Sequence, residues 1–264
     1  MAVIFYLSGT GNSLYAAKSI AQELEQCRLE GITGYLKAPY EVQDEVVGIV
    51  CPVYCMALPP VVEAFLQQVK MVPQYIFLVV TMGAMSGQAL GQGKELLKQR
   101  ELRLSYGAQV ALPDNSIVFP SPQARQEKLL RSAPAELGLI ARNIKNKYDN
   151  YQHLDRGFLW KYGGTAAGMW VLDKIKQFGK LSCADDKCVG CGICAEVCPA
   201  GNITMAAGKP AFGSECVHCF GCAHWCPQNA ISLGRLKPDL KTRYKHPEIT
   251  PAELAVQKER KEEV

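Results

Sequence analysis

The chain has 264 residues, of which 48% are hydrophobic and 20% are charged, and its formal net charge is +4. These values are typical of a soluble globular protein with one or two domains, and so small an excess of basic residues excludes the charge pattern of a nucleic-acid-binding protein. No apolar run approaches the ~18 residues of a membrane-spanning helix. The start of the chain lacks the basic residues of a signal peptide, so we expect a cytoplasmic protein without a membrane span.

Apolar runs alternate with amphipathic stretches through residues 1–150. We expect strands at Ala2–Leu7, Arg28–Leu36, Glu45–Val50, Tyr75–Val80 and Leu104–Leu112. We expect helices at Ser13–Gln26, Pro59–Val69, Gly87–Arg100 and Gln123–Tyr148, the last one interrupted at Pro134. Strands and helices that alternate with short connections predict an α/β fold with a doubly wound parallel sheet.

The composition divides the chain into four parts. Residues 1–150 form the α/β domain, and residues 151–180 are a connecting segment. Residues 181–235 are rich in cysteine and glycine, and residues 236–264 are a charged C-terminal tail. The last part of the tail, Ala252–Glu263, is either a marginal helix or disordered.

Nine of the twelve cysteines lie within residues 181–235. Two C-x2-C-x2-C-x3-C runs account for eight of them, and a proline follows each run. The first run is Cys188, Cys191, Cys194 and Cys198, and the second is Cys216, Cys219, Cys222 and Cys226. In a reducing cytosol, cysteines with this spacing indicate metal ligation rather than disulfides.

The spacing of the two runs suits two [4Fe–4S] clusters. Three thiolates separated by two residues surround three corners of a cubane, and the fourth cysteine of each run reaches the other cluster. We therefore expect one cluster on Cys188, Cys191, Cys194 and Cys226, and a second on Cys216, Cys219, Cys222 and Cys198. The alternative is structural zinc, whose four-cysteine sites usually show two CxxC pairs with a longer spacer.

A loop of glycines, hydroxyl residues and an amide follows the first expected strand and consists of Ser8, Gly9, Thr10, Gly11, Asn12 and Ser13. Glycines let the backbone turn toward an anion, and the N-terminus of the next helix contributes free N–H groups. Leu14 replaces the third glycine of a dinucleotide motif, and the loop has no P-loop lysine. The loop therefore favours the monophosphate of FMN, and the alternative is an ordinary strand-to-helix turn.

Two further loops should lie beside this one, because ligands of doubly wound sheets bind at the carboxyl ends of the strands. One loop contains Pro52, Val53 and Tyr54, and the other contains Thr81, Met82, Gly83 and Ala84. We expect Tyr54 to stack on a flavin ring and the second loop to bond the edge of the ring. The alternative for Tyr54 is a partly buried anchor. We interpret Cys51 and Cys55 as small apolar loop residues and Cys183 as a free thiol.

The segment Phe5–Ser13 resembles the FMN phosphate loop of flavodoxins, and the two cysteine runs resemble those of two-cluster ferredoxins. Their order in one chain is similar to the flavodoxin–ferredoxin fusion proteins of anaerobic bacteria and archaea. The resemblance implies a flavodoxin-like sheet of strand order 2-1-3-4-5 and a second, smaller α+β ferredoxin domain. The chain departs from the flavodoxin pattern at Asn12 and Ser13, where flavodoxins have a threonine-rich end to the loop.

These features predict an iron–sulfur flavoprotein of the oxidoreductase class. Clusters carry single electrons and a flavin carries one or two, so we expect electrons to pass between the clusters and FMN and to reduce a small-molecule substrate. The long segment 114–180 favours a substrate cavity. The alternatives are a pure electron carrier between partner proteins and a non-redox sensor with structural clusters. An electron donor or acceptor protein is the expected partner, the two modules meet within one chain or across a homodimer, and no catalytic acid or base is identified.

Overall fold

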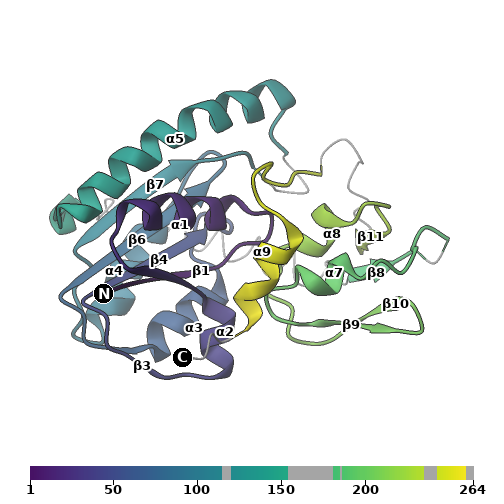
Figure 1. Cartoon of the computed structure of the whole chain (residues 1–264), viewed down its shortest axis with the longest axis horizontal. Coiled ribbons are helices and arrows are strands. Elements are labelled where there is room, and N and C mark those ends of the chain that lie inside the picture. The colour runs from purple at the N-terminus through teal and green to yellow at the C-terminus, as the bar shows by residue number, and fades with distance from the viewer. Residues whose placement is uncertain (115–119, 154–180, 185, 235–242, 260–264) are drawn as a thin grey trace.

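The computed structural model describes residues 1–114, 120–153, 181–184, 186–234 and 243–259. Its largest element is a five-stranded parallel sheet in the order β2-β1-β4-β6-β7 (Figure 1). These strands are β1 (Ala2–Tyr6), β2 (Cys27–Gly31), β4 (Val46–Pro52), β6 (Tyr75–Met82) and β7 (Tyr106–Ala111). Numbered among themselves, the five strands have the order 2-1-3-4-5. The predicted doubly wound, flavodoxin-like fold is therefore confirmed.

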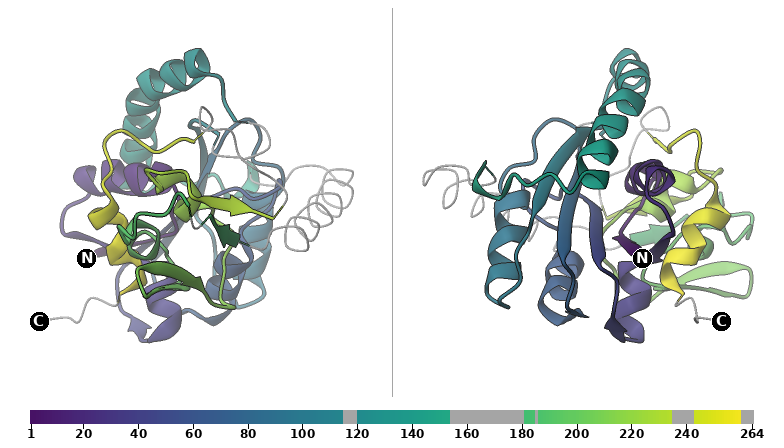
Figure 2. Two further views of the ribbon diagram at one scale, coloured as in Figure 1. Left: turned by 90° about the vertical axis from the view of Figure 1, so that its right-hand side faces the viewer. Right: turned by 60° about the vertical axis from the view of Figure 1, so that its left-hand side comes forward.

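Helices cover both faces of the sheet (Figures 1 and 2). One face carries α1 (Asn12–Glu23) and α5 (Gln123–Lys145), and the other carries α2 (Ile32–Lys37), α3 (Pro60–Gln68) and α4 (Ala89–Lys98). Successive strand residues enter opposite cores, as the pleat requires: Phe5 packs with α3, whereas Tyr6 packs on the side of α1 and α5. The remaining strands of this region, β3 (Glu41–Val42) and β5 (Lys70–Met71), form a short parallel pair.

Two predicted elements differ from the structure. The strand expected at Arg28–Leu36 ends at Gly31, and α2 begins at Ile32, because Ile32 and Tyr35 turn into the core next to α3. The helix expected to break at Pro134 runs through it as α5. Pro134 is exposed, while Ala133 and Leu137 on either side are buried against the sheet. This packing offsets the lost hydrogen bond. No helix in the described part of the chain is long and apolar enough to cross a membrane.

The cysteine-rich region is a smaller α+β unit built from two similar halves. Its elements are β8 (Leu181–Cys183), α7 (Ile193–Glu196), β9 (Ile203–Ala206), β10 (Lys209–Phe212), α8 (Gly221–Trp225) and β11 (Ile231–Leu233). The strands pair antiparallel as β8 with β11 and β9 with β10, and α7 contacts α8. Gly192 and Phe220 precede α7 and α8, and both adopt left-handed backbone conformations. The sequence repeat is therefore also a structural repeat.

The end of the chain returns to the sheet domain, and we call residues 243–259 the C-terminal segment. It contains α9 (Pro251–Ala255) and the 3-10 turn η4 (Val256–Lys258), and Figure 1 shows α9 between the sheet and the cysteine-rich unit. A capping box between Thr250 and Glu253 begins α9. Leu254 joins the core under α1, so this part of the predicted tail is an ordered helix. The predicted connecting segment begins with a 3-10 turn, η1 (Tyr151–His153), and its residues 154–180 lie outside the described ones.

Candidate functional site

The carboxyl ends of β1, β4 and β6 bring the three predicted flavin loops to one edge of the sheet. The Ser13 and Thr81 hydroxyl oxygens lie 2.8 Å apart, and the Val53 N–H donates to the Thr81 carbonyl at 3.0 Å. The Asn12 amide donates to the Pro113 carbonyl at 2.9 Å, which adds the loop after β7. Strand order alone places these loops together, as the doubly wound topology predicts.

The loop Ser8–Ser13 has the features of a phosphate site. Gly11 is the N-cap of α1 at φ 102°, and it has no side chain to satisfy the first N–H groups of the helix. Its own N–H donates to Ser8 Oγ at 3.2 Å, which holds the loop curved. The Thr10 and Ser13 side chains are each 1% exposed. Helix N–H groups and hydroxyls are donors that suit a phosphate, so the donor chemistry of this loop is that of a phosphate site.

The cysteine-rich unit packs directly on this loop. A Cβ added to Gly9 would lie 2.6 Å from the Cys219 carbonyl oxygen, and one added to Gly221 would lie 2.7 Å from the Gly9 carbonyl oxygen. The Trp225 indole donates to that same Gly9 oxygen at 3.1 Å. Glycine is therefore required on both sides, because only two glycines allow the backbones to come so close.

The C-terminal segment covers the rest of the loop. The Gln257 amide accepts from the Ser8 N–H at 3.0 Å and donates to the Ser8 carbonyl at 2.9 Å. The His246 N–H donates to the Thr10 carbonyl at 2.8 Å, and the Tyr244 hydroxyl donates to the Asn12 side chain at 2.8 Å. The cysteine-rich unit and the end of the chain therefore cover the loop, and a Cβ added to Gly11 would lie 2.9 Å from the His246 Cβ.

Tyr54 connects the second predicted flavin loop to the cysteine-rich unit. Its backbone exchanges hydrogen bonds with Ala57 at 2.9 Å in both directions, which fixes a tight turn after β4. Burial raises the pKa of the Tyr54 hydroxyl well above its usual value, and the Cys219 and Cys216 thiols nearby raise it further. The predicted flavin-stacking residue thus lies beside two predicted cluster ligands.

The other predicted loop residues surround the same edge. Pro52 ends β4, and Val53 packs on the core below. Met82 ends β6, Gly83 lies so close to Asp114 that an added Cβ would be 2.5 Å from it, and Ala84 is exposed.

The two loop cysteines differ in their surroundings. Cys51 is fully buried in the core shared with α3, in keeping with an apolar role, and Cys55 is half-buried at φ 48°.

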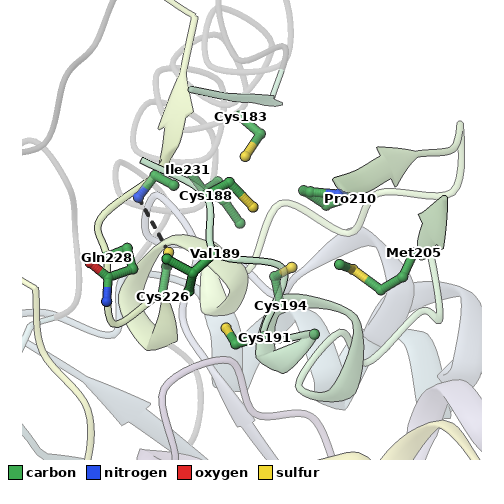
Figure 3. A pocket seen from close by; sticks show the side chains of 12 residues that line it. Cys183, Cys188, Val189, Cys191, Cys194, Met205, Pro210, Cys226, Gln228 and Ile231 are labelled. Carbon is green, nitrogen blue, oxygen red and sulfur yellow. Dashed lines mark hydrogen bonds between the residues drawn. The ribbon is translucent and has the colours of Figure 1, made fainter. Parts of the chain in front are cut away.

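Four cysteines of the predicted first cluster line one cavity. Cys188, Cys191, Cys194 and Cys226 surround it together with Cys183 (Figure 3). The Ala230 N–H donates to Cys226 Sγ at 3.3 Å. Burial raises the pKa of Cys194, and the Cys226 and Cys191 thiols add to the shift. Buried thiols that face one another ionise only with a compensating cation, which iron would supply. This donor set fits a cubane.

The four cysteines of the predicted second cluster are also close together. Burial raises the pKa of Cys219 to about 12, and Cys198 and Cys216 contribute to the shift as neighbouring thiols. Burial likewise raises the pKa of Cys222 well above its usual value, with contributions from the other three. The Asn202 N–H donates to Cys198 Sγ at 3.3 Å, which matches the contact of Ala230 with Cys226 one repeat later.

The two groups of cysteines meet at a shared apolar core. Cys194 of the first group and Cys222 of the second pack in one hydrophobic cluster with Ile203 and Ile231. Arg243 of the C-terminal segment approaches both groups, since it donates to the Ala223 carbonyl and, at 3.0 Å, to the Ile231 carbonyl. The geometry therefore places the two groups side by side, with the Arg243 guanidinium at their junction.

Sequence reasoning missed the residues that join the units. Trp225 lies inside the second cysteine run, directly before Cys226, and this position is the one feature of the sequence that marks it as part of a site. Arg243, His246 and Gln257 lie in a charged tail without a motif, so nothing in the sequence marks them. Gln257 is fully buried, and His246 is 1% exposed.

Comparisons with known proteins bear on each unit separately. Residues 187–231 match the family described as 4Fe-4S dicluster domain. The cysteine-rich unit is thus similar to a 4Fe–4S dicluster domain. The match occupies the part of the chain that contains both cysteine runs. None of the curated proteins matches the chain.

Solved structures resemble the sheet domain. The two-electron reduced flavodoxin of Megasphaera elsdenii is 20% identical with a TM-score of 0.34, and the alignment covers 53% of this chain and 98% of that chain. The flavodoxin of Streptococcus pneumoniae is 14% identical with a TM-score of 0.33, and the alignment covers 53% of this chain and 98% of that chain. The Trp repressor binding protein of Bacillus subtilis is 10% identical with a TM-score of 0.35, and the alignment covers 51% of this chain and 96% of that chain. Since these scores are low, the fold assignment rests on the strand order itself.

Proposed function

We propose that the chain is an electron-transfer flavoprotein that binds two [4Fe–4S] clusters and FMN and passes electrons between them. The observation that carries the proposal is the contact of Cys219 with Gly9 of the phosphate loop, together with Tyr54 beside Cys216 and Cys219. A proposed cluster ligand thus touches the proposed flavin loop. The contact lies within one chain, which supports an intrachain route rather than one across a dimer.

The proposed ligands follow the crossed assignment. The first cluster is held by Cys188, Cys191, Cys194 and Cys226, which share a cavity, and the second by Cys198, Cys216, Cys219 and Cys222. Cys191 is exposed, and its neighbour Val189 is 65% exposed. The first cluster would therefore exchange electrons with a partner protein, whereas the second lies against the flavin loop.

The proposed FMN site uses the loop Ser8–Ser13 for the phosphate and the loops at Tyr54 and Thr81 for the ring. When bound, FMN supplies a centre that accepts electrons singly or in pairs. The protein contributes N–H and hydroxyl donors to the phosphate, and the cysteine-rich unit and C-terminal segment exclude water from it. Tyr54 orients the ring beside the second group of cysteines.

The destination of the electrons is proposed to be a partner protein. In the sequence, a small-molecule substrate is favoured only by the length of segment 114–180. Within residues 120–153, α5 packs against α1 and β7 as a layer of the fold, and its first turn reaches the loop at Thr81, where Arg125 donates to the Gly83 carbonyl at 2.9 Å. If the reduced, purified protein consumed a small molecule, the protein would be a reductase and not an electron carrier.

Cofactor analysis of anaerobically purified protein tests the assignment. We expect about eight iron, eight acid-labile sulfide and one FMN per chain. Thr10→Ala should weaken FMN binding by about 1–3 kcal/mol, because a buried hydroxyl is lost from the phosphate site. Riboflavin binding should be the same in both proteins, which makes riboflavin the matched control. Zinc in place of iron, or equal affinity of the wild type for FMN and riboflavin, would refute the proposal.

A further inference from the structure

The cavity of the proposed first cluster contains more cysteines than a cubane requires. Five line it, namely Cys183, Cys188, Cys191, Cys194 and Cys226 (Figure 3). A [4Fe–4S] cluster has four iron corners and takes four thiolates. Cys183 lies outside both sequence runs, so its presence in this cavity is a result of folding rather than of the motif.

Backbone contacts fix the position of Cys183. It ends β8 and pairs with Ile231 of β11, and the next residue, Ala184, donates to the Ala230 carbonyl at 2.9 Å. The Ala184 carbonyl in turn accepts from the Cys188 N–H at 3.2 Å, which holds the two cysteines near each other. Cys183 is therefore held by regular hydrogen bonding on the same side of the cavity as Cys188.

The Cys183 side chain points at the predicted ligands. Its thiol donates to the Ala184 carbonyl at 3.8 Å and lies near the Cys188, Cys194 and Cys226 thiols. Figure 3 shows the Cys183 and Cys188 sulfur atoms facing each other, while Cys191 lies at the opposite end of the group. A thiol that faces one ligand from the same cavity can replace that ligand with little movement of the chain.

We propose that Cys183 is a reserve ligand of the first cluster, able to take over the iron corner held by Cys188. In the exchange, the bond from iron to Cys188 Sγ breaks, a bond from iron to Cys183 Sγ forms, and the Cys183 proton passes to Cys188 Sγ. No electron is transferred, so the exchange needs no oxidant or reductant. The inference rests on the proposed function, because it assumes a cluster in this cavity.

The test compares Cys188→Ala, Cys183→Ala, the double variant of both, and Cys191→Ala in the full chain, purified anaerobically. We expect Cys183→Ala to keep about eight iron, and Cys188→Ala to keep about eight iron with an altered electron paramagnetic resonance signal. The double variant should keep only about four, those of the second cluster, which also report that the chain is folded. Cys191→Ala is the matched control and should lose iron, because Cys183 lies near Cys188, Cys194 and Cys226 and at the opposite end of the group from Cys191.

Three results would overturn the inference. The first is an equal iron content in Cys188→Ala and the double variant, and the second is a loss of iron in Cys183→Ala alone. The third is full iron retention in Cys191→Ala, which would show that the corner needs no replacement thiol. Wild-type protein without about eight iron would instead refute the proposed function, so the two failures can be told apart.

Discussion

Arg243 is a charged residue that lies close to both groups of cysteines. Its guanidinium donates to the Ala223 and Ile231 carbonyls, beside the proposed ligands Cys222 and Cys226. Burial lowers the pKa of Arg243 from its usual value, and the Cys226 and Cys222 thiols act in the opposite direction. An arginine stays charged at neutral pH. A fixed positive charge at this point should favour the reduced, more negative state of the clusters.

Arg243→Gln should therefore shift the reduction potentials of the clusters to more negative values. Glutamine keeps a hydrogen-bond donor but removes the charge. A redox titration followed by electron paramagnetic resonance measures the shift, and Arg103→Gln is the control, since Arg103 is exposed and paired with Asp149 away from the cysteines. Unchanged potentials in an Arg243→Gln protein with full iron content would contradict this role.

His246, whose N–H donates to the Thr10 carbonyl, should make the stability of the protein depend on pH. Its ring stacks on Tyr15 with the centroids 4.1 Å apart, and its Nδ1 accepts from the Glu248 N–H. Its Nε2 is buried without a hydrogen-bond partner in the described structure. Burial lowers the pKa of His246 from 6.5 to about 4. The unfolded chain therefore binds this proton more readily, so stability is full above pH 6.5 and falls as the pH drops toward 4.

His246→Phe should make the protein less sensitive to acid. The pKa difference implies that the wild type loses about 2 kcal/mol of unfolding free energy between about pH 7 and pH 5 through this residue. Phenylalanine keeps the stacking on Tyr15 and does not titrate. Anaerobic urea unfolding at both pH values, compared between the two proteins, measures the difference. If both proteins lose the same free energy, His246 does not titrate as described.

At the scale of elements, the C-terminal segment connects the two units. Gln257 is hydrogen-bonded to Ser8 of the loop Ser8–Ser13, and the Lys258 ammonium donates to the Ala195 and Glu196 carbonyls of α7 at 3.1 and 3.0 Å. A Cβ added to Gly31 would lie 1.8 Å from the Gln257 carbonyl oxygen, so the segment lies directly on β2. Gln257 thus binds the sheet domain, and the next residue, Lys258, binds the cysteine-rich unit.

Gln257→Ala should destabilise the protein by about 1–3 kcal/mol, because it leaves the buried N–H and carbonyl of Ser8 without partners. Gln67→Ala is the matched control, since Gln67 is an exposed residue of α3 and should change stability by less than about 0.5 kcal/mol. Anaerobic urea unfolding measures both. A Gln257→Ala protein as stable as the wild type would show that the C-terminal segment does not hold the loop.

The elements that the sequence predicts correctly are those with strong local patterns. β1, β4 and β6 are apolar runs that end in turn residues, and they are found close to their expected bounds. The error at Arg28–Leu36 has a tertiary cause, because Ile32 and Tyr35 become helical only by packing beside α3. The expected break at Pro134 is likewise prevented by contacts with the sheet, which a local pattern does not contain.

At the scale of the whole molecule, the sequence identifies what each unit contains but not how the units meet. The cysteine spacing and the loop Ser8–Ser13 are local signals, so both candidate sites can be predicted. The contact between Gly9 and Cys219 joins residues more than two hundred positions apart in the sequence, and no local sequence pattern predicts it. The Gln257 contact is equally remote in the sequence, since it depends on the chain returning to β1 at its end.

We infer that the two units form one electron-transfer path within a chain. Rapid anaerobic mixing with a donor that reduces only the clusters tests it most directly, with the cluster and flavin absorbances followed separately. We expect the flavin to be reduced after the clusters, at a rate that does not depend on protein concentration. A flavin that stays oxidised while the clusters are fully reduced, even with excess donor, would contradict it.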